Sequence, residues 1–215
     1  MNRPMERQGF TLIELLVVIT IIGILGALGM TMMASSKRKA EDLECGAMVQ
    51  TLGASLEQYK NDRRHGAYPA TSLEGHPGLP KLGNRSNMGI EALFVALESK
   101  DYRGDHPSES IGDKFFKNTD EDLAPKSLTL YGAADLFEYV DPWDNPFAYF
   151  SAADYGNLDV RQYYVAEGGS GIYEPVTVKP WINEKTKSPF NPTTYQIFSA
   201  GRDGIFNTED DIGNW

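Results

Sequence analysis

The sequence predicts an α+β fold in which a long N-terminal helix packs on a small antiparallel sheet. The segment 10–33 is apolar with a single carboxylate, Glu14. Apolar residues then continue at helical spacing, on one face only, to about residue 60. Short strand-like segments separated by Pro, Gly, Asn and Asp turns follow in the second half of the chain. These three observations define the fold class.

The apolar segment is long enough to cross a membrane. At about 1.5 Å per residue, a helix over residues 10–33 exceeds a hydrocarbon core of roughly 30 Å. A buried core helix in a soluble protein is rarely apolar all round for so long. We therefore predict three parts: a leader (1–9), a transmembrane helix (10–33), and a globular domain (34–215) that includes the second half of the helix.

Glu14 is the unusual residue of this segment. A carboxylate inside a membrane costs about 2.5 kcal/mol or more, so it usually has a partner. Cleavage between Gly9 and Phe10 would create an α-amino group four residues before Glu14. Glu14 could pair with this amine on its own chain or on a neighbouring subunit, and the neighbour would then set the register of an assembly. The alternative is a simple anchor whose Glu14 reaches the lipid headgroups.

The rest of the chain can be divided by its periodicity. One helix is expected from about residue 11 to residue 60, with a stripe for packing the globular domain. A short helix is expected over 90–97, and strands over 147–150, 163–166 and 195–199, with a shorter one near 176–178. The charged segment 98–128, which contains Asp120-Glu121-Asp122, is interpreted as a long surface insertion. The stripe consists of Cys45, Met48, Val49, Leu52, Leu56 and Tyr59.

Charge and cysteine content exclude several functions. The net charge is -10, from 20 basic and 30 acidic residues, and the acidic excess lies after Met33. An acidic domain argues against nucleic acid as a partner and is compatible with a cation site. The single Cys45 cannot form an internal disulfide. No metal-ligand spacing of histidines and no nucleophile–base pair indicates an enzyme.

The C-terminal loop, residues 199–215, is rich in carboxylates. Asp203 and Asp211 bracket a turn of the chain, and Gly204 would let carbonyl groups face inward. Hard cations such as calcium take six to eight oxygen ligands. The spacing of an EF-hand is absent, so a solvated acidic loop remains the alternative on composition alone.

The N-terminal residues resemble the prepilin signature of type IV pilins and type II secretion pseudopilins. The matching features are a short leader that ends in Gly9 and the sequence Phe10-Thr11-Leu12-Ile13-Glu14. The resemblance implies a pilin-like fold, cleavage after Gly9 by a prepilin peptidase, N-methylation of Phe10, and packing of the helix into a filament core. It also implies insertion into the inner membrane, with the C-terminal domain in the periplasm.

Segments 68–75, 141–147 and 199–215 are similar to the major, G-type pseudopilins of type II secretion. This resemblance implies a structural filament subunit that drives protein export across the outer membrane. Its partners would be copies of itself, minor pseudopilins and the inner-membrane assembly platform. Calcium in the C-terminal loop is implied too. The ligands implied are Asp203 and Asp211. Asp210 adds a carboxylate where the family often has a small residue, and the carbonyl groups of Ile205 and Thr208 are further candidate ligands.

Two departures from the family pattern stand out. Residues 205–209 replace the glycines that usually follow the first Asp-Gly of the loop, and insertions lie near 83–135 and 166–194. The alternatives within the class are a minor pseudopilin or a type IV pilin subunit. The alternative outside it is a membrane-anchored binding module that does not polymerise.

Overall fold

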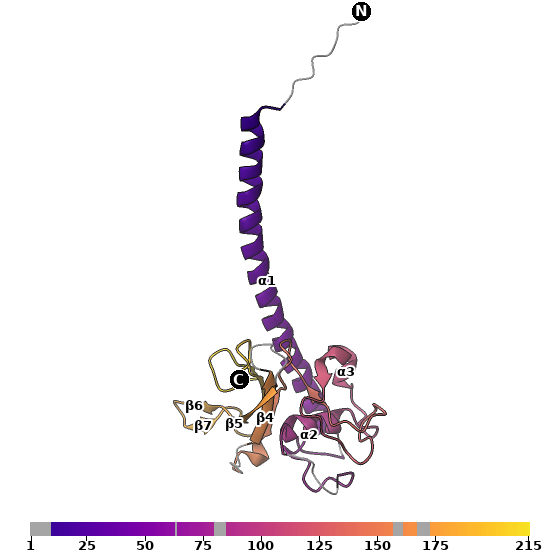
Figure 1. Ribbon diagram of the computed structural model, residues 1–215. Coiled ribbons are helices and arrows are strands. Elements are labelled where there is room, and N and C mark those ends of the chain that lie inside the picture. The colour runs from indigo at the N-terminus through magenta and orange to yellow at the C-terminus, as the bar shows by residue number, and fades with distance from the viewer. Residues whose placement is uncertain (1–9, 63, 80–84, 157–160, 167–172) are drawn as a thin grey trace, which may run out of the picture. The chain divides into compact units, whose positions relative to one another are not determined.

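The computed structural model describes residues 10–62, 64–79, 85–156, 161–166 and 173–215, without the side chains of 26–31, 34, 161–166, 173 and 174 (Figure 1). The chain divides into two compact units, Met1–Glu41 and Asp42–Trp215. The predicted leader, including Gly9, lies outside the described residues. The prediction of its cleavage therefore stays a prediction.

The long helix α1 runs over Leu12–Asn61, within one residue of the predicted bounds at each end. In the second unit its predicted stripe is buried: Cys45, Leu52 and Leu56 are 0% exposed, and Met48 and Val49 are 4% exposed. Tyr59 packs at the edge of the same core. The periodicity in the sequence therefore identified the packing face correctly.

Helix α2 (Met88–Leu97) confirms the predicted short helix and begins two residues earlier. It is buried almost all round because it lies between two hydrophobic clusters. Ile90 and Phe94 face the main core, whereas Ala92 and Val95 face a smaller one that includes Leu136. A helix covered on both sides can carry few polar residues, and Glu91 at its first turn is therefore exceptional.

The interpretation of residues 98–128 as a surface insertion was wrong, because much of the segment packs on the core. It contains α3 (Pro107–Ile111), the 3₁₀ helix η1 (Asp113–Phe115) and β1 (Phe116–Lys117). Glu98, which is fully buried, accepts hydrogen bonds from the amide and hydroxyl of Ser108 and from the Tyr139 hydroxyl, at 2.9, 2.8 and 2.7 Å. These bonds satisfy the buried carboxyl and hold the insertion in place.

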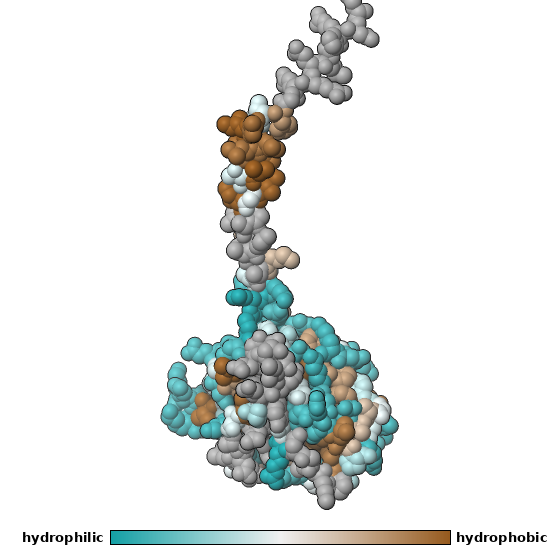
Figure 2. Space-filling view, in the orientation of Figure 1, coloured by the Kyte–Doolittle hydropathy of each residue, from teal (hydrophilic) through white to brown (hydrophobic). Residues whose placement is uncertain are grey.

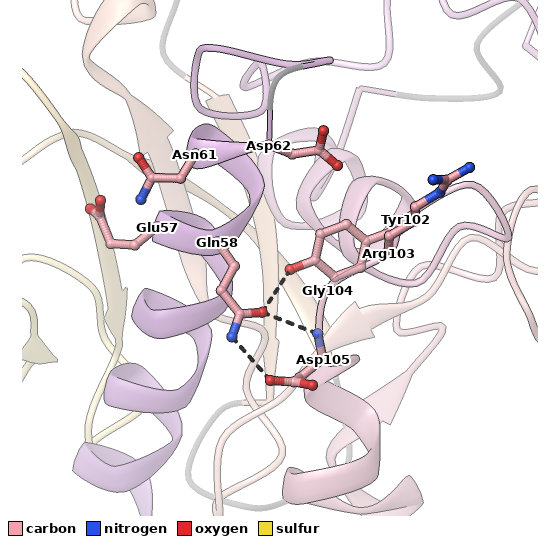
Figure 3. A pocket seen from close by; sticks show the side chains of 8 residues that line it. All are labelled: Glu57, Gln58, Asn61, Asp62, Tyr102, Arg103, Gly104 and Asp105. Atoms are coloured by element: carbon pink, nitrogen blue, oxygen red, sulfur yellow. Dashed lines mark hydrogen bonds between the residues drawn. The ribbon is translucent and has the colours of Figure 1, made fainter.

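A second attachment joins this segment to the end of α1. The amide of Gln58 donates to the Asp105 carboxylate at 3.0 Å, and its carbonyl oxygen accepts from the Asp105 backbone amide at 3.1 Å (Figure 3). Tyr102, which is buried, donates its hydroxyl to the backbone of Ser55. Gln58, Tyr102 and Asp105 border a pocket of about 600 Å³. The residues that line it are mostly of polar or charged type: Glu57, Gln58, Asn61, Asp62, Tyr102, Arg103, Gly104 and Asp105.

The strands form several small antiparallel sheets rather than one. In the described parts of the chain, the largest has three strands in the order β3 (Ala148–Ser151), β8 (Tyr195–Ser199) and β9 (Ile212–Gly213). β8 has the predicted bounds, and β3 lies one residue later than predicted. Three two-stranded sheets accompany it: β1 with β2 (Glu138–Tyr139), β4 (Arg161–Ala166) with β5 (Tyr173–Val178), and β6 (Ile182–Asn183) with β7 (Ser188–Pro189).

The predicted turn before β3 is held by one buried carboxylate. Asp141 Oδ1 accepts the backbone amides of Trp143 and Asn145 at 2.8 and 3.0 Å, and its Oδ2 accepts the Ser199 hydroxyl at 2.6 Å. Asp144, at φ 71°, turns the chain. Asp141 thus connects the turn to the end of β8. Its burial raises the pKa of the carboxyl to about 7, although its hydrogen bonds act in the opposite direction.

Candidate functional site

The N-terminal part of α1 exposes a continuous apolar surface. Figure 2 shows hydrophobic residues covering this part of the helix. The exposed fractions run from 44% at Val18 to 88% at Leu12. Apolar surface of this extent marks a site of interaction. The residues are Phe10, Leu12, Ile13, Leu15, Leu16, Val17, Val18, Ile19, Ile21, Ile22, Ile24 and Leu25.

None of the helices, over the residues that the structure describes, combines the length and the apolar character that a membrane span requires.

Glu14 lies at the start of α1 and bonds to Thr11. Its carboxylate accepts the Thr11 backbone amide at 2.9 Å and the Thr11 hydroxyl at 2.6 Å, while the Glu14 amide points to the Thr11 Oγ1 at 3.3 Å. This is a capping box, in which the residue before the helix and the third helical residue satisfy each other's amides. The spacing Thr-x-x-Glu is the signal in the sequence from which this capping box can be predicted.

The C-terminal loop gathers three acceptor oxygen atoms around the Thr208 hydroxyl. Thr208 Oγ1 lies 3.2 Å from Asp203 Oδ2, 2.6 Å from Asp210 Oδ1 and 3.1 Å from the Ile205 carbonyl oxygen. A hydroxyl has one proton and can donate to only one of these acceptors. Asp210 Oδ2 also accepts the backbone amides of Arg202 and Asp203. The loop thus brings together an excess of oxygen acceptors.

Asp211, predicted as the second main carboxylate ligand, is engaged elsewhere. Its Oδ2 accepts the Trp181 indole N–H at 2.8 Å and the Asn207 amide at 2.9 Å. Burial raises the pKa of Asp211 to about 6, and the Trp181 bond opposes this shift most strongly. Asp211 therefore anchors the loop to Trp181, whereas Asp203 and Asp210 face Thr208.

Gly201 is required by the approach of the two ends of this loop. Its φ is +67°, and a Cβ at this position would collide with the backbone carbonyl and the carboxylate of Asp210. A residue with a side chain would be strained in this conformation and would displace Asp210. Glycine at position 201 therefore keeps Asp210 next to Asp203.

One group of carboxylates was not expected from the sequence pattern. Glu91, Asp120 and Asp122 each bring one carboxylate oxygen within 4.8 Å of the other two. Asp120 and Asp122 had been interpreted as surface residues of the insertion. A single carboxylate in the apolar run of α2 was the signal at Glu91, comparable to the one that drew attention to Glu14.

Comparison with known protein families indicates the class to which the N-terminal segment is similar. Residues 5–30 match the model of the prokaryotic N-terminal methylation motif. The long helix, the small antiparallel sheets and this motif agree with a prepilin-type protein. No solved structure gives a significant match.

Over nearly its whole length the chain is similar to proteins named type II secretion system core protein G. The relative from Aeromonas hydrophila is 26% identical over 209 residues, which cover 97% of this chain and 92% of that protein. The relative from Pseudomonas aeruginosa is 26% identical over 210 residues (98% and 96%), and that from Escherichia coli is 24% identical over 210 residues (98% and 92%). The resemblance to G-type pseudopilins noted in the sequence is confirmed by these matches.

Proposed function

We propose that this chain is a structural subunit of a pilus-like filament in type II secretion, and that it is not an enzyme. The observation that carries the proposal is the exposed apolar surface over residues 10–25. Such a surface is not stable in water and needs lipid or other apolar helices around it. The methylation motif and the similarity to core protein G support a filament of copies of this chain.

In this proposal a prepilin peptidase removes residues 1–9, and Phe10 becomes the methylated N-terminus. Residues 10–33 lie in the inner membrane before assembly and in the filament core afterwards, while the second unit lies in the periplasm. Identical subunits joined by a heterologous contact build a helical filament. An inner-membrane assembly platform and minor pseudopilins would be the further partners.

Glu14 is proposed to pair with the Phe10 amine of a neighbouring subunit and to set the register. Its capping bonds to Thr11 provide a second, local role, and variants can separate the two. Glu14→Gln keeps an acceptor oxygen for Thr11 and removes the charge. Glu14→Ala removes both functions, whereas Thr11→Ala removes most of the capping box and keeps the charge.

The test measures leader cleavage and filament yield for these three variants. We expect cleavage in all of them, loss of filaments in Glu14→Ala and Glu14→Gln, and filaments in Thr11→Ala. Filaments at the normal yield in Glu14→Gln, with loss in Thr11→Ala, would show that Glu14 acts only as a cap. Cleaved subunits of the native chain that stay monomeric at high density in the membrane would refute the filament role.

We also propose calcium in the C-terminal loop. Asp203, Asp210 and the Ile205 carbonyl supply oxygen atoms of the kind that calcium takes, and Thr208 lies among them. The geometry favours Asp210 over Asp211 as the second carboxylate. A cation there would relieve the excess of acceptors.

A thermal melt of the full chain in detergent, with calcium and with chelator, tests this site. A ligand that binds only the folded state raises the melting temperature by mass action. We expect the rise to shrink in Asp203→Asn and Asp210→Asn. An unchanged calcium-induced rise in both variants would contradict a cation site in this loop.

A further inference from the structure

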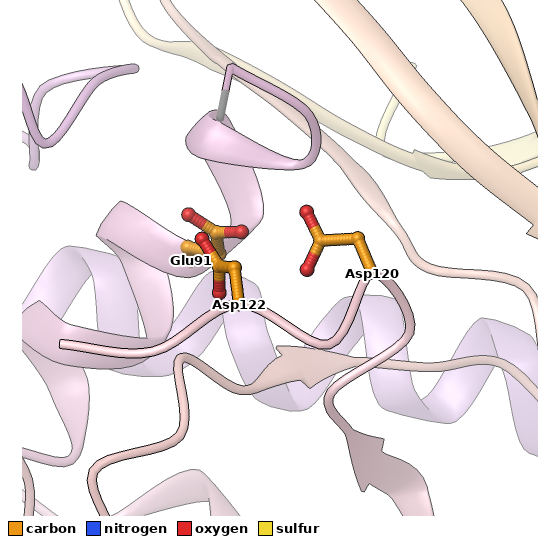
Figure 4. Close-up of side chains that lie close together, drawn as sticks. All are labelled: Glu91, Asp120 and Asp122. Atoms are coloured by element: carbon orange, nitrogen blue, oxygen red, sulfur yellow. The ribbon is translucent and has the colours of Figure 1, made fainter. Parts of the chain in front are cut away.

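A cluster of three carboxylates lies away from the C-terminal loop. The acidic cluster consists of Glu91 on α2 and of Asp120 and Asp122 on the loop after β1 (Figure 4). One oxygen of each carboxylate lies within 4.8 Å of the other two. Residues some 30 positions apart in the sequence thus meet at one point.

Glu91 is buried with an unsatisfied oxygen. The residue is 1% exposed, and its Oε1 is buried without a hydrogen-bond partner among the described residues. Oδ1 of Asp122 is likewise buried without a hydrogen-bond partner among the described residues. Buried polar atoms in native proteins nearly always have partners, because an unpaired one costs free energy comparable to a lost hydrogen bond. Two such atoms, in carboxylates that each bring an oxygen within 4.8 Å of the other, indicate a missing ligand.

The surroundings add negative charge rather than compensate for it. In the part of the chain that the structure describes, neither Glu91 nor Asp122 forms an ion pair with a basic side chain. Burial, followed by the charges of Asp122, Glu138 and Asp120, raises the pKa of Glu91 well above its ordinary value. Burial and the charge of Asp120 raise that of Asp122 to about 7. A cation is the ligand that this concentration of negative charge attracts.

The backbone around the cluster is fixed by polar contacts that hold the loop and the helix together. The side chain of Asn118 accepts the Asp122 amide at 3.1 Å and donates to the Asp122 carbonyl at 2.7 Å, which closes the loop on itself. Glu138 accepts the Thr119 amide and the Asn87 side-chain amide, both at 2.9 Å. Asn87 directly precedes α2, so this network ties the loop to the helix that carries Glu91.

We propose that Glu91, Asp120 and Asp122 bind a divalent cation, and that calcium is its preferred occupant. Three carboxylates without nitrogen or sulfur donors select a hard cation. Calcium accepts irregular coordination with six to eight oxygens, and water can complete it because Asp120 and Asp122 are only partly buried. The bound ion would join α2 to the insertion and stabilise the segment that distinguishes this chain.

The test counts calcium ions bound per full-length chain in detergent, by equilibrium dialysis with calcium alone. The cluster variant is Glu91→Gln with Asp122→Asn, which keeps side-chain volume and removes two charges. The control variant is Glu109→Gln with Asp113→Asn, two exposed acids of the same insertion. We expect the cluster variant to bind one calcium fewer than the native chain, and the control variant to bind the native number.

Thermal melts of the same proteins give a second readout, because the cluster variant and the native chain should differ in opposite ways in chelator and in calcium. In chelator, the cluster variant should melt at or above the native temperature, because repulsion between buried carboxylates is removed; this also shows that it folds. In calcium, the native chain should gain about 5 °C or more over the gain of the cluster variant. Equal calcium counts in the native chain and the cluster variant would overturn the proposal. The cluster would then consist of carboxyl groups that burial keeps protonated.

Calcium bound by the C-terminal loop does not alter the expected difference in calcium count. The native chain and the cluster variant should differ by one bound ion whether or not the loop binds calcium. Asp203→Asn in both backgrounds separates the two sites. This substitution should lower the calcium count equally in both backgrounds if the loop binds calcium. It should leave both counts unchanged if the loop does not.

Discussion

Replacing Asp141 by Asn should remove a specific part of the pH dependence of stability. The folded carboxyl has a pKa raised from 3.8 to about 7, chiefly by burial. A group whose folded pKa is raised binds more protons in the folded state, so its contribution to stability is full below the unfolded pKa and is lost as pH rises through the folded pKa. For Asp141 the loss falls between about pH 4 and pH 8.

The magnitude follows from linkage. With a pKa of 3.8 in the unfolded chain and about 7 in the folded one, Asp141 lowers the free energy of unfolding by about 2–3 kcal/mol between pH 5 and pH 8. For a chain of this size that is a fall in melting temperature of about 5–10 °C. At pH 5 the folded carboxyl is neutral, and an amide is its neutral analogue. Asp141→Asn keeps an acceptor for the backbone amides of Trp143 and Asn145 and does not titrate.

The assay is tryptophan fluorescence during a thermal melt of the full chain in detergent with chelator, from pH 5 to pH 8. Trp143, Trp181 and Trp215 all report on the second unit. Other carboxyls titrate in the same range, but they are common to both proteins and cancel in the comparison. We expect similar melting temperatures near pH 5 and a higher one for Asp141→Asn at pH 8. Parallel curves over the whole range would refute the raised pKa.

Three further predictions concern the second unit. Leu52→Ala, in the fully buried stripe, should destabilise it by about 2–5 kcal/mol, whereas Leu43→Ala, 75% exposed on the same helix, should change stability by less than about 0.5 kcal/mol in chemical denaturation. Gly201→Ala should reduce the rise in melting temperature caused by calcium, because its Cβ meets the loop backbone; Gly132→Ala, with open space around it, is the control. Cys45 should not react with thiol reagents at pH 8 until the protein is denatured, because burial raises its pKa to about 12; rapid labelling of the native chain would contradict its burial.

The parts of the fold that depend on sequence-local patterns were predictable. The stripe from Cys45 to Leu56 repeats over several turns and identified one face of α1, and the alternation at 195–199 gave the bounds of β8. Strands of two residues, such as β6 and β9, carry no period that a sequence can show. They exist because a partner strand and the core hold them in place.

The candidate sites also divide into those that the sequence predicts directly and those that only the packing of the chain reveals. The methylation motif is contiguous, so residues 10–14 predicted it directly. In the C-terminal loop composition indicated the carboxylates, but only the fold showed that Asp211 bonds to Trp181. The acidic cluster depends on the packing of residues about 30 positions apart. The polar character of segment 98–128 suggested solvent, whereas Glu98 and its partners bury part of it.

The capping box has a consequence for how filaments could grow and shorten. In the isolated subunit the Glu14 carboxylate already has two partners at Thr11, so a newly inserted chain does not hold an unsatisfied charge while it waits. If Glu14 pairs with a neighbour as proposed, docking would exchange these local bonds for an intermolecular pair. The lost bonds to Thr11 would then offset part of the gain from the pair. Apolar contacts around the helix would have to supply much of the remaining free energy of assembly.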